Sequence, residues 1–160
     1  MEGAIFDCPA SWEPWLPPQV RRLTDVGELT GREWGVLALT AAGCAKLTGQ
    51  EIRCELLLLP GDCPLRRLDG VRPRHAVSYG LSPRDSLTLS SLRQPVLCVQ
   101  RTLPMPDGEA VEPQEIPLLD LPAPAVQLLP LLGLRLLGRA ALILRGSGEG
   151  DGPSREGRAP

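Results

Sequence analysis

The segment that most constrains the fold of this chain is a nearly continuous apolar run at residues 52–59, IRCELLLL, which ends at Pro60 and Gly61. A strand with one solvent-facing side alternates apolar and polar residues, whereas a strand covered on both faces reads as such a run. We therefore predict a buried strand in a parallel or mixed sheet. Because both faces of this sheet must be covered, the run indicates an α/β fold.

The length of 160 residues suits one domain and leaves too little for two well-cored domains. Hydrophobic residues make up 42% of the chain and charged residues 22%, a composition that excludes wholesale disorder. We expect an extended arm rich in Pro and Trp at residues 1–22 and a single α/β domain at 23–145. Residues 146–160, GSGEGDGPSREGRAP, lack any apolar side chain larger than Ala, so we expect a disordered tail there.

A helix is predicted to follow the arm. Thr30 and Glu33 match the capping-box pattern, in which each side chain bonds the backbone amide near the other residue. Apolar residues then recur at helical spacing up to Leu47, and Gly49 supplies a left-handed stop. We expect these residues to pack as a helix on the sheet.

The rest of the domain carries shorter strand and helix signals. Strict alternation, β-branched residues and turn residues mark the strands, and a leucine-rich run marks the last helix. We predict a loop with one helical turn at 61–73, a strand at 75–79, an antiparallel hairpin of 86–90 and 96–103, an edge strand within 111–119, and a helix within 123–144. The expected fold is thus a mixed sheet that contains an antiparallel meander and is flanked by helices.

Charge argues against nucleic acid as a partner. The formal net charge is -2, and the arginines are scattered along the chain. A protein that binds phosphates needs a basic stripe or patch. The densest basic cluster, Arg66, Arg67, Arg72 and Arg74, is interrupted by Asp69, so we interpret it as a solvated loop.

Three observations concern location and partners. The apolar segment 118–144 contains charged residues and three early prolines, so we interpret it as a core helix and expect no membrane span. The start MEGAIFDCP has acids where an export signal has basic residues, and the five cysteines form no CxxC pair, so we expect a cytoplasmic protein with reduced thiols. Trp12 and Trp15 either anchor the arm to the domain or bind a protein partner.

Standard catalytic and cofactor motifs are missing from the sequence. It contains neither a GxxxxGK[ST] loop nor a GxGxxG motif, so no cofactor is expected. His75 is the single histidine, which leaves little for a nucleophile and base pair. Cys44, Cys54 and Cys63 with His75 could supply four zinc ligands, but structural zinc sites usually use closely spaced pairs. We expect no metal and interpret these cysteines as small core residues.

The segment 78–85, SYGLSPRD, is the one that a purely structural role explains least. Tyr79 is the only tyrosine, and Gly80 at a strand end allows another backbone or a ligand to approach. Ligands of α/β proteins bind at strand ends. The candidate ligand-binding residues are therefore Asp62, His75, Tyr79, Gly80 and Asp85. The alternative is a tight connection between two strands.

The order LLLLPGDCP, then HAVSYGL, then SLTLSSL resembles the later part of the central domain of Mur ligases. In that family a strand ending in Asn-Asp-Asp-Pro precedes a strand ending in Tyr/Phe-Gly and a β-meander; here Asp62 with Pro64, and Tyr79 with Gly80, hold the matching positions. The P-loop of the family and its His-Asn-x-x-Asn segment have no counterpart. The strings YGLSPRDSLTLSS, VLCVQRTL and EPQEIP also resemble a small protein family of Firmicutes bacteria, from which no activity carries over.

Two functions follow as hypotheses. The favoured one is a non-catalytic cytoplasmic domain, a module like that of Mur ligases without the P-loop, which binds a partner protein or a small ligand. The alternative is a small ligand-processing enzyme that gathers Asp62, Cys63, His75, Tyr79 and Asp85 at neighbouring strand ends. An acid, a thiol and an imidazole act together only within hydrogen-bond reach of one substrate, so the enzyme requires these side chains to converge.

Overall fold

The computed structural model describes residues 2–105 and 107–144, which form ten strands, two α-helices and three short 3-10 helices. The strands are β1 Gly3–Phe6, β2 Val20–Leu23, β3 Glu33–Leu39, β4 Ile52–Pro60, β5 Val71–Tyr79, β6 Leu87–Leu89, β7 Val96–Val99, β8 Leu103–Pro104, β9 Ala110–Val111 and β10 Gln114–Pro117. The helices are α1 Ala41–Lys46 and α2 Ala125–Leu137, with η1 Ala10–Trp15, η2 Val26–Leu29 and η3 Leu65–Leu68 between strands.

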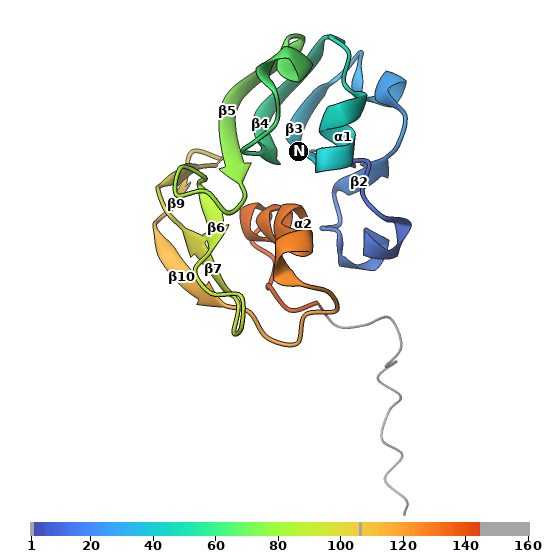
Figure 1. Cartoon of the computed structure of the whole chain (residues 1–160). Coiled ribbons are helices and arrows are strands. Elements are labelled where there is room, and N and C mark those ends of the chain that lie inside the picture. Colours follow the sequence, from blue (N-terminus) through green and yellow to red (C-terminus); the bar gives the residue numbers. More distant parts are fainter. Residues whose placement is uncertain (1, 106, 145–160) are drawn as a thin grey trace, which may run out of the picture.

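Eight of these strands form one mixed sheet in the order β10-β7-β6-β5-β4-β3-β1-β2 (Figure 1). The strands from β2 to β5 are all parallel. β6 lies beside the end of β5 and pairs with it in parallel at one position, Tyr79 with Leu87. β6, β7 and β10 then pair antiparallel. The predicted fold class, a single α/β domain with a mixed sheet and an antiparallel meander, is therefore confirmed.

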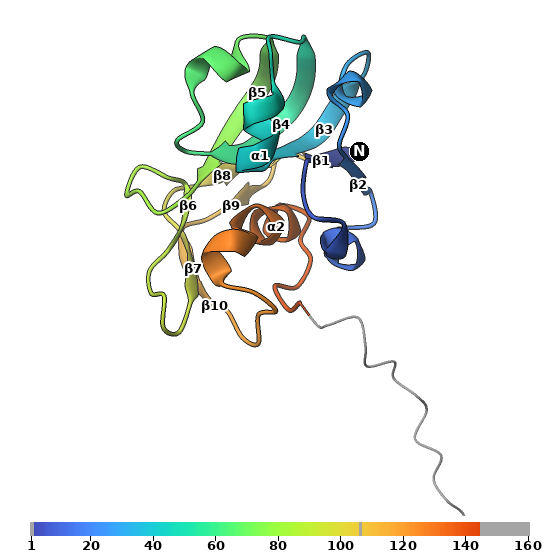
Figure 2. The ribbon, with the colours of Figure 1, turned by 45° about the vertical axis from the view of Figure 1, so that its right-hand side comes forward.

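The two faces of the sheet bury two separate hydrophobic cores. Neighbouring residues of one strand enter opposite cores: Leu57 packs with α1 and Trp34, whereas Leu58 packs with α2. Figure 2 shows α1 over the parallel strands β3 and β4, and α2 beside the antiparallel end of the sheet. β4 has a parallel neighbour on each side and buried residues on both faces. The apolar run at residues 52–59 therefore forms the doubly covered strand that its composition predicts.

The helix predicted from Thr30 is wrong, because residues 33–39 form strand β3. Pairing with β1 and β4 buries Trp34, Leu37 and Leu39 on one face and Ala38 on the other. This burial outweighs a helix propensity that is worth only tenths of a kcal/mol per residue. The hydroxyl of Thr30 donates to the carbonyl of Gly27 at 3.0 Å.

The helical part of the predicted helix is confined to α1, and its cap is Thr40. The Oγ1 atom of Thr40 accepts from the amide of Gly43 at 3.0 Å and donates to the carbonyl of Phe6 at 3.1 Å. A side chain at Gly43 would meet the carbonyl oxygen of Phe6 at 2.5 Å. Glycine therefore lets the first turn of α1 lie directly against the end of β1.

The N-terminal residues differ from the extended arm that we expected for 1–22. Residues 3–6 form β1, which lies between β2 and β3 inside the sheet. Its residues Ala4, Ile5 and Phe6 are fully buried, so these few apolar side chains join the core despite the prolines that follow. Trp12 is buried and Trp15 is half-buried against the α2 core, which matches the anchoring alternative for the two tryptophans.

The remaining predicted elements are confirmed, with shifted ends. β6 and β7 form the predicted hairpin, and β10 is the predicted edge strand. β5 begins at Val71, earlier than expected, and the helical turn η3 precedes it. The last helix is shorter than 123–144, because α2 ends at Leu137 before Gly138. The expected tail at 146–160 lies outside the described residues.

Candidate functional site

Four of the five predicted ligand-binding residues lie around the carboxyl ends of β4 and β5. Asp62 is in the turn after β4, Tyr79 ends β5, and Gly80 and Asp85 begin and close the loop to β6. The structure therefore brings these residues to one edge of the sheet, as expected for an α/β protein. What they can do there depends on which groups their polar atoms contact.

The hydroxyl of Tyr79 is bound within the protein. It donates to the carbonyl of Leu39 at 2.7 Å, and the side chain is 7% exposed. Burial raises the pKa of Tyr79, and the nearby Cys44, Asp62 and Cys63 raise it further. Tyr79 therefore stays neutral and links the end of β5 to the end of β3 across β4.

Asp85 holds the loop between β5 and β6. Its amide donates to the carbonyl of Ser82 at 3.0 Å, and its Oδ2 atom accepts from the amide of Ser82 at 3.0 Å. The carboxylate is buried against Gly61 and Gly80, and a Cβ atom at either glycine would overlap it. Gly80 thus permits close approach of a carboxylate of the same chain, and both residues have a structural role that matches the tight connection.

His75 does not join the other candidates. It is exposed in the middle of β5, opposite Leu56 of β4. Tyr79 lies four positions further along the strand, at a distance of about 13 Å. The imidazole therefore lies too far from the strand ends to exchange a proton with a group bound there.

A small cavity of about 210 Å³ opens beside α1 at the same edge of the sheet. Cys44 of α1 and Cys63 of the turn after β4 both line it, together with Asp62, Arg66 and Arg67. Burial raises the pKa of Cys44, and the nearby thiol of Cys63 raises it further. No sequence pattern pairs Cys44 with Cys63, because 18 intervening residues include the whole of β4.

The possible zinc ligands do not gather. Cys54 is buried in β4, where burial raises its thiol pKa to about 12, and His75 is exposed on β5. Across residues 2–105 and 107–144, no three His, Cys, Asp or Glu side chains are placed to hold a metal ion.

Neither helix in these same ranges has the length and apolarity that a membrane crossing requires.

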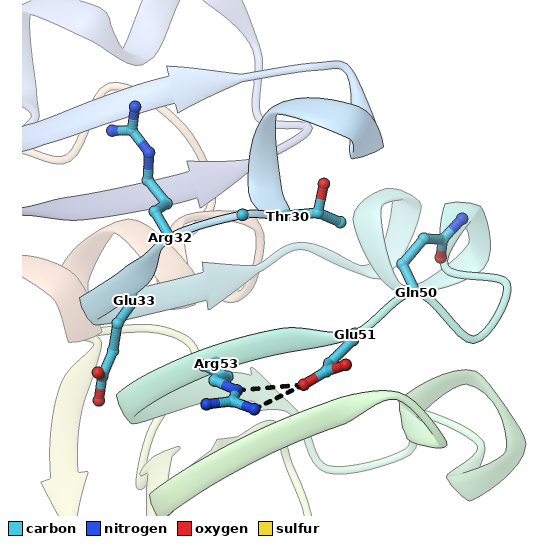
Figure 3. Close-up of a pocket in the computed structure, with 7 residues that line it drawn as sticks. Thr30, Arg32, Glu33, Gln50, Glu51 and Arg53 are labelled. Atoms are coloured by element: carbon cyan, nitrogen blue, oxygen red, sulfur yellow. Dashed lines mark hydrogen bonds and ion pairs between the residues drawn. The ribbon is translucent and has the colours of Figure 1, made fainter.

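A hollow of about 700 Å³ lies at the opposite edge, over the amino ends of β3 and β4. Figure 3 shows Arg32 and Glu33 at the start of β3, with Glu51 and Arg53 at the start of β4. The guanidinium of Arg53 donates to Oε1 of Glu51 through Nε at 3.1 Å and Nη2 at 2.9 Å. No motif in the sequence marks this surface, since its charged residues precede or alternate with the buried residues of the strands.

A second hollow of about 480 Å³ adjoins the first, and the two share Glu33, Glu51 and Arg53. It extends over the start of β5, where Arg72 and Arg74 line it. We call the two hollows together the polar groove. Its charged side chains are Arg32, Arg53, Arg72, Arg74, Glu33 and Glu51.

The arginines of the polar groove are held in several ways. Arg32 binds Glu2 at 3.0 Å and lies 5.0 Å from the ring of the buried Trp34. Arg72 donates to the carbonyl of Asp69 at 2.8 Å, and Arg74 lies 3.8 Å from Glu55. These contacts position the guanidinium groups while leaving their outer faces exposed.

One border of the polar groove is an open strand edge. Among the described strands, β6 reaches β5 only at Tyr79, so residues 71–78 have β4 on one side alone. Residues 72–76 are exposed, and Figure 1 shows β5 at the border of the parallel strands. Pro73 has no N–H group, which limits extension of the sheet at this point.

Comparison of the chain with protein-family models, with curated proteins and with solved structures found no match in any of the three.

Proposed function

We propose that this chain is a non-catalytic binding domain, and that it binds a protein partner that places acidic side chains in the polar groove. The observation that supports this most is the excess of arginine over glutamate in the groove. Four arginines and two glutamates line it, whereas the chain as a whole has a net charge of -2. The side chains that line the groove therefore carry an excess of positive charge, and the carboxylates of Glu2 and Glu55 beside the groove pair with Arg32 and Arg74.

The shape and chemistry of the groove favour a macromolecule over a small ligand. Six charged side chains line it across three strands, whereas small-ligand sites contain only a small number of polar groups. Arginine is enriched in protein interfaces, because its planar guanidinium binds carboxylates through two parallel hydrogen bonds. Arg32, Arg53 and Arg72 are already oriented by contacts within the chain, which lowers the entropy lost on binding.

The non-catalytic part of the proposal rests on the groups that could do chemistry. The hydroxyl of Tyr79 and the carboxylate of Asp85 are each bound to a backbone group of the same chain. His75 lies about 13 Å along β5 from the strand ends. The alternative enzyme would need these three groups around one substrate, so their separation favours binding over catalysis.

The resemblance to Mur ligases belongs to the same proposal. The resemblance rests on the strands that end at Pro60 and Tyr79, and the sequence lacks the P-loop with which the family binds nucleotide. We propose a bacterial, cytoplasmic module of this type that has kept the sheet for binding. A small ligand related to nucleotides or cell-wall precursors is the competing form of this proposal.

Charge reversal in the groove tests the proposed function. We would capture partners from cells of the source organism with tagged wild-type chain and with Arg53→Glu/Arg72→Glu. The matched control is Arg93→Glu/Arg101→Glu, which changes the net charge equally at exposed sites outside the groove. We expect the affinity for the captured partner to fall by at least about tenfold, or ~1.4 kcal/mol, in the groove variant alone.

Two results would contradict the proposal. Equal loss of affinity in the groove variant and the control would show that only overall charge matters. A rise in melting temperature with nucleotides or cell-wall precursors, together with partner capture that the groove variant does not change, would favour the small-ligand alternative. Circular dichroism and the melting temperature of each variant would establish that it is folded.

A further inference from the structure

We infer that Cys44 and Cys63 are a thiol pair that oxidised glutathione, or a similar disulfide, converts reversibly to an intramolecular disulfide bond. This inference does not depend on the proposed function, because the pair lies at the opposite edge of the sheet from the polar groove. All five cysteines are free thiols in the structure. The pair is distinguished by its position.

The fold places the two thiols on either side of one small cavity. Cys44 lies in α1, which is capped by Thr40 directly after β3. Cys63 closes the turn after β4, where its amide donates to the carbonyl of Pro60 at 3.1 Å. Both side chains line the same cavity, and Cys63 lies near enough to Cys44 to raise its pKa. A disulfide requires two Cβ atoms about 4 Å apart, a spacing that neighbouring thiols approach with little movement of the backbone.

The two thiols differ in their exposure to solvent, and this difference sets the order in which they react. Cys44 is 3% exposed, whereas Cys63 is half-buried. An oxidant therefore reacts first with Cys63, and the more deeply buried Cys44 is the resolving thiol. Arg66 and Arg67 line the cavity, and their positive charge favours the approach of the anionic glutathione disulfide.

The other cysteines cannot take the place of either partner. Cys54 precedes Pro60 by six residues in β4, which puts it roughly 20 Å from the turn that holds Cys63. Cys8 and Cys54 are buried, in opposite cores. Cys98 is half-buried in β7, where Thr88 and Glu115 are its strand neighbours. It has the exposure of Cys63 without a second thiol beside it.

The reaction consists of two exchanges that conserve atoms and electrons. The thiolate of Cys63 attacks one sulfur of oxidised glutathione, the glutathione S–S bond breaks, and the first glutathione leaves as a thiolate that takes up a proton. The thiolate of Cys44 then attacks Sγ of Cys63 in the mixed disulfide, and the second glutathione leaves in the same way. The two cysteines are oxidised to one disulfide and one glutathione disulfide is reduced to two thiols. Burial raises the pKa of Cys44, so the second exchange should become faster as the pH rises.

The test uses the full chain incubated with oxidised glutathione and then quenched with acid, followed by alkylation of all free thiols in urea, intact-mass measurement and peptide mapping. We expect the loss of two hydrogen atoms, a single Cys44–Cys63 crosslink, three alkylated cysteines, and full reversal by dithiothreitol. The crosslink should raise the urea concentration at the unfolding midpoint, because it fastens α1 to the end of β4. Cys98→Ser should form the same crosslink, whereas Cys63→Ser should form none and leave Cys44 alkylated.

Each other outcome overturns the inference. Five alkylated cysteines after incubation would show that the pair does not react. Glutathione retained on Cys63 would show that Cys44 cannot reach it. Crosslinks that include Cys98, or that form equally in urea and in buffer, would show that pairing occurs in unfolded chains. Circular dichroism of Cys63→Ser before oxidation would show whether its result reports a folded protein, and Cys44→Ala, which should retain glutathione on Cys63, tests the pair independently.

Discussion

The contact between Asp85 and two glycines gives the sharpest prediction of stability. Gly61 does not have a positive φ angle, so alanine there meets no backbone strain. The obstacle is the Asp85 carboxylate, which a Cβ atom at Gly61 would overlap. Forcing extra volume into such a site costs about 1–3 kcal/mol. We therefore expect Gly61→Ala to destabilise the protein by about this amount.

The same substitution should have the opposite effect once the carboxylate is gone. Asp85→Ala alone removes the acceptor for the amide of Ser82, a loss of about 1.5–3 kcal/mol for a bond to a charged group. In that background Gly61→Ala meets no clash and restricts the unfolded chain, which stabilises by about 0.4–1 kcal/mol. The two changes should thus be coupled by more than about 1 kcal/mol, the size seen for residues in contact.

Urea unfolding of the wild type, both single variants and the double variant measures this coupling. The free energies of unfolding should show Gly61→Ala to be harmful when Asp85 is present, and neutral or favourable in the Asp85→Ala background. Strict additivity of the two changes would refute the reasoning. It would mean that the carboxylate does not occupy the space above Gly61.

Three more predictions concern the core. Tyr79→Phe should lower the free energy of unfolding by about 1–2 kcal/mol in urea titrations, because the buried carbonyl of Leu39 loses its donor; no change would mean that the carbonyl finds another partner. Burial raises the pKa of Cys8 to about 11 and that of Cys54 to about 12, so both thiols ionise at a lower pH in the unfolded chain than in the folded protein. The stability that these two thiols contribute is complete below pH 9 and should fall by on the order of 5 kcal/mol by pH 11. A flat profile from pH 8 to 11, or one that Cys54→Ala leaves unchanged, would contradict this assignment. Deleting residues 1–18 should abolish cooperative unfolding in calorimetry, because β1 lies inside the sheet, and a sharp transition in the truncated chain would show that β2 and β3 can close the gap.

The local sequence predicted those elements whose pattern of apolar and polar residues matches their environment in the folded sheet. The run at 52–59 suits a strand that is covered on both faces, and the alternation at 86–90 suits a strand of a hairpin; both segments form strands in the sheet. The segment from Thr30 shows why other parts could not be predicted. Its capping pattern and spacing fit a helix, but residues 34–39 gain more from pairing with β1 and β4 than from a helix on the surface. β1 itself has only four residues, too few for a periodic signal.

The sheet edge at which the predicted ligand-binding residues gather could be predicted, but the contacts of these residues could not. Strand ends and loop residues placed Asp62, Tyr79 and Asp85 at one edge correctly, since parallel strands end together. The hydrogen bonds that Tyr79 and Asp85 make with Leu39 and Ser82 depend on how loops fold over the ends of neighbouring strands, which no local pattern encodes. The contact between the two cavity cysteines and the assembly of the polar groove are likewise products of strand order.

Amide hydrogen exchange of the captured complex tests the central claim most directly, namely that the polar groove is the binding surface. The exchange rate of each segment would be compared between the free chain and the complex. The account predicts slower exchange at residues 31–33, 50–54 and 71–74, with little change at 61–67 around the cysteine cavity. Protection confined to 61–67 and 80–86, with the groove unchanged, would contradict the account and return the binding site to the strand ends.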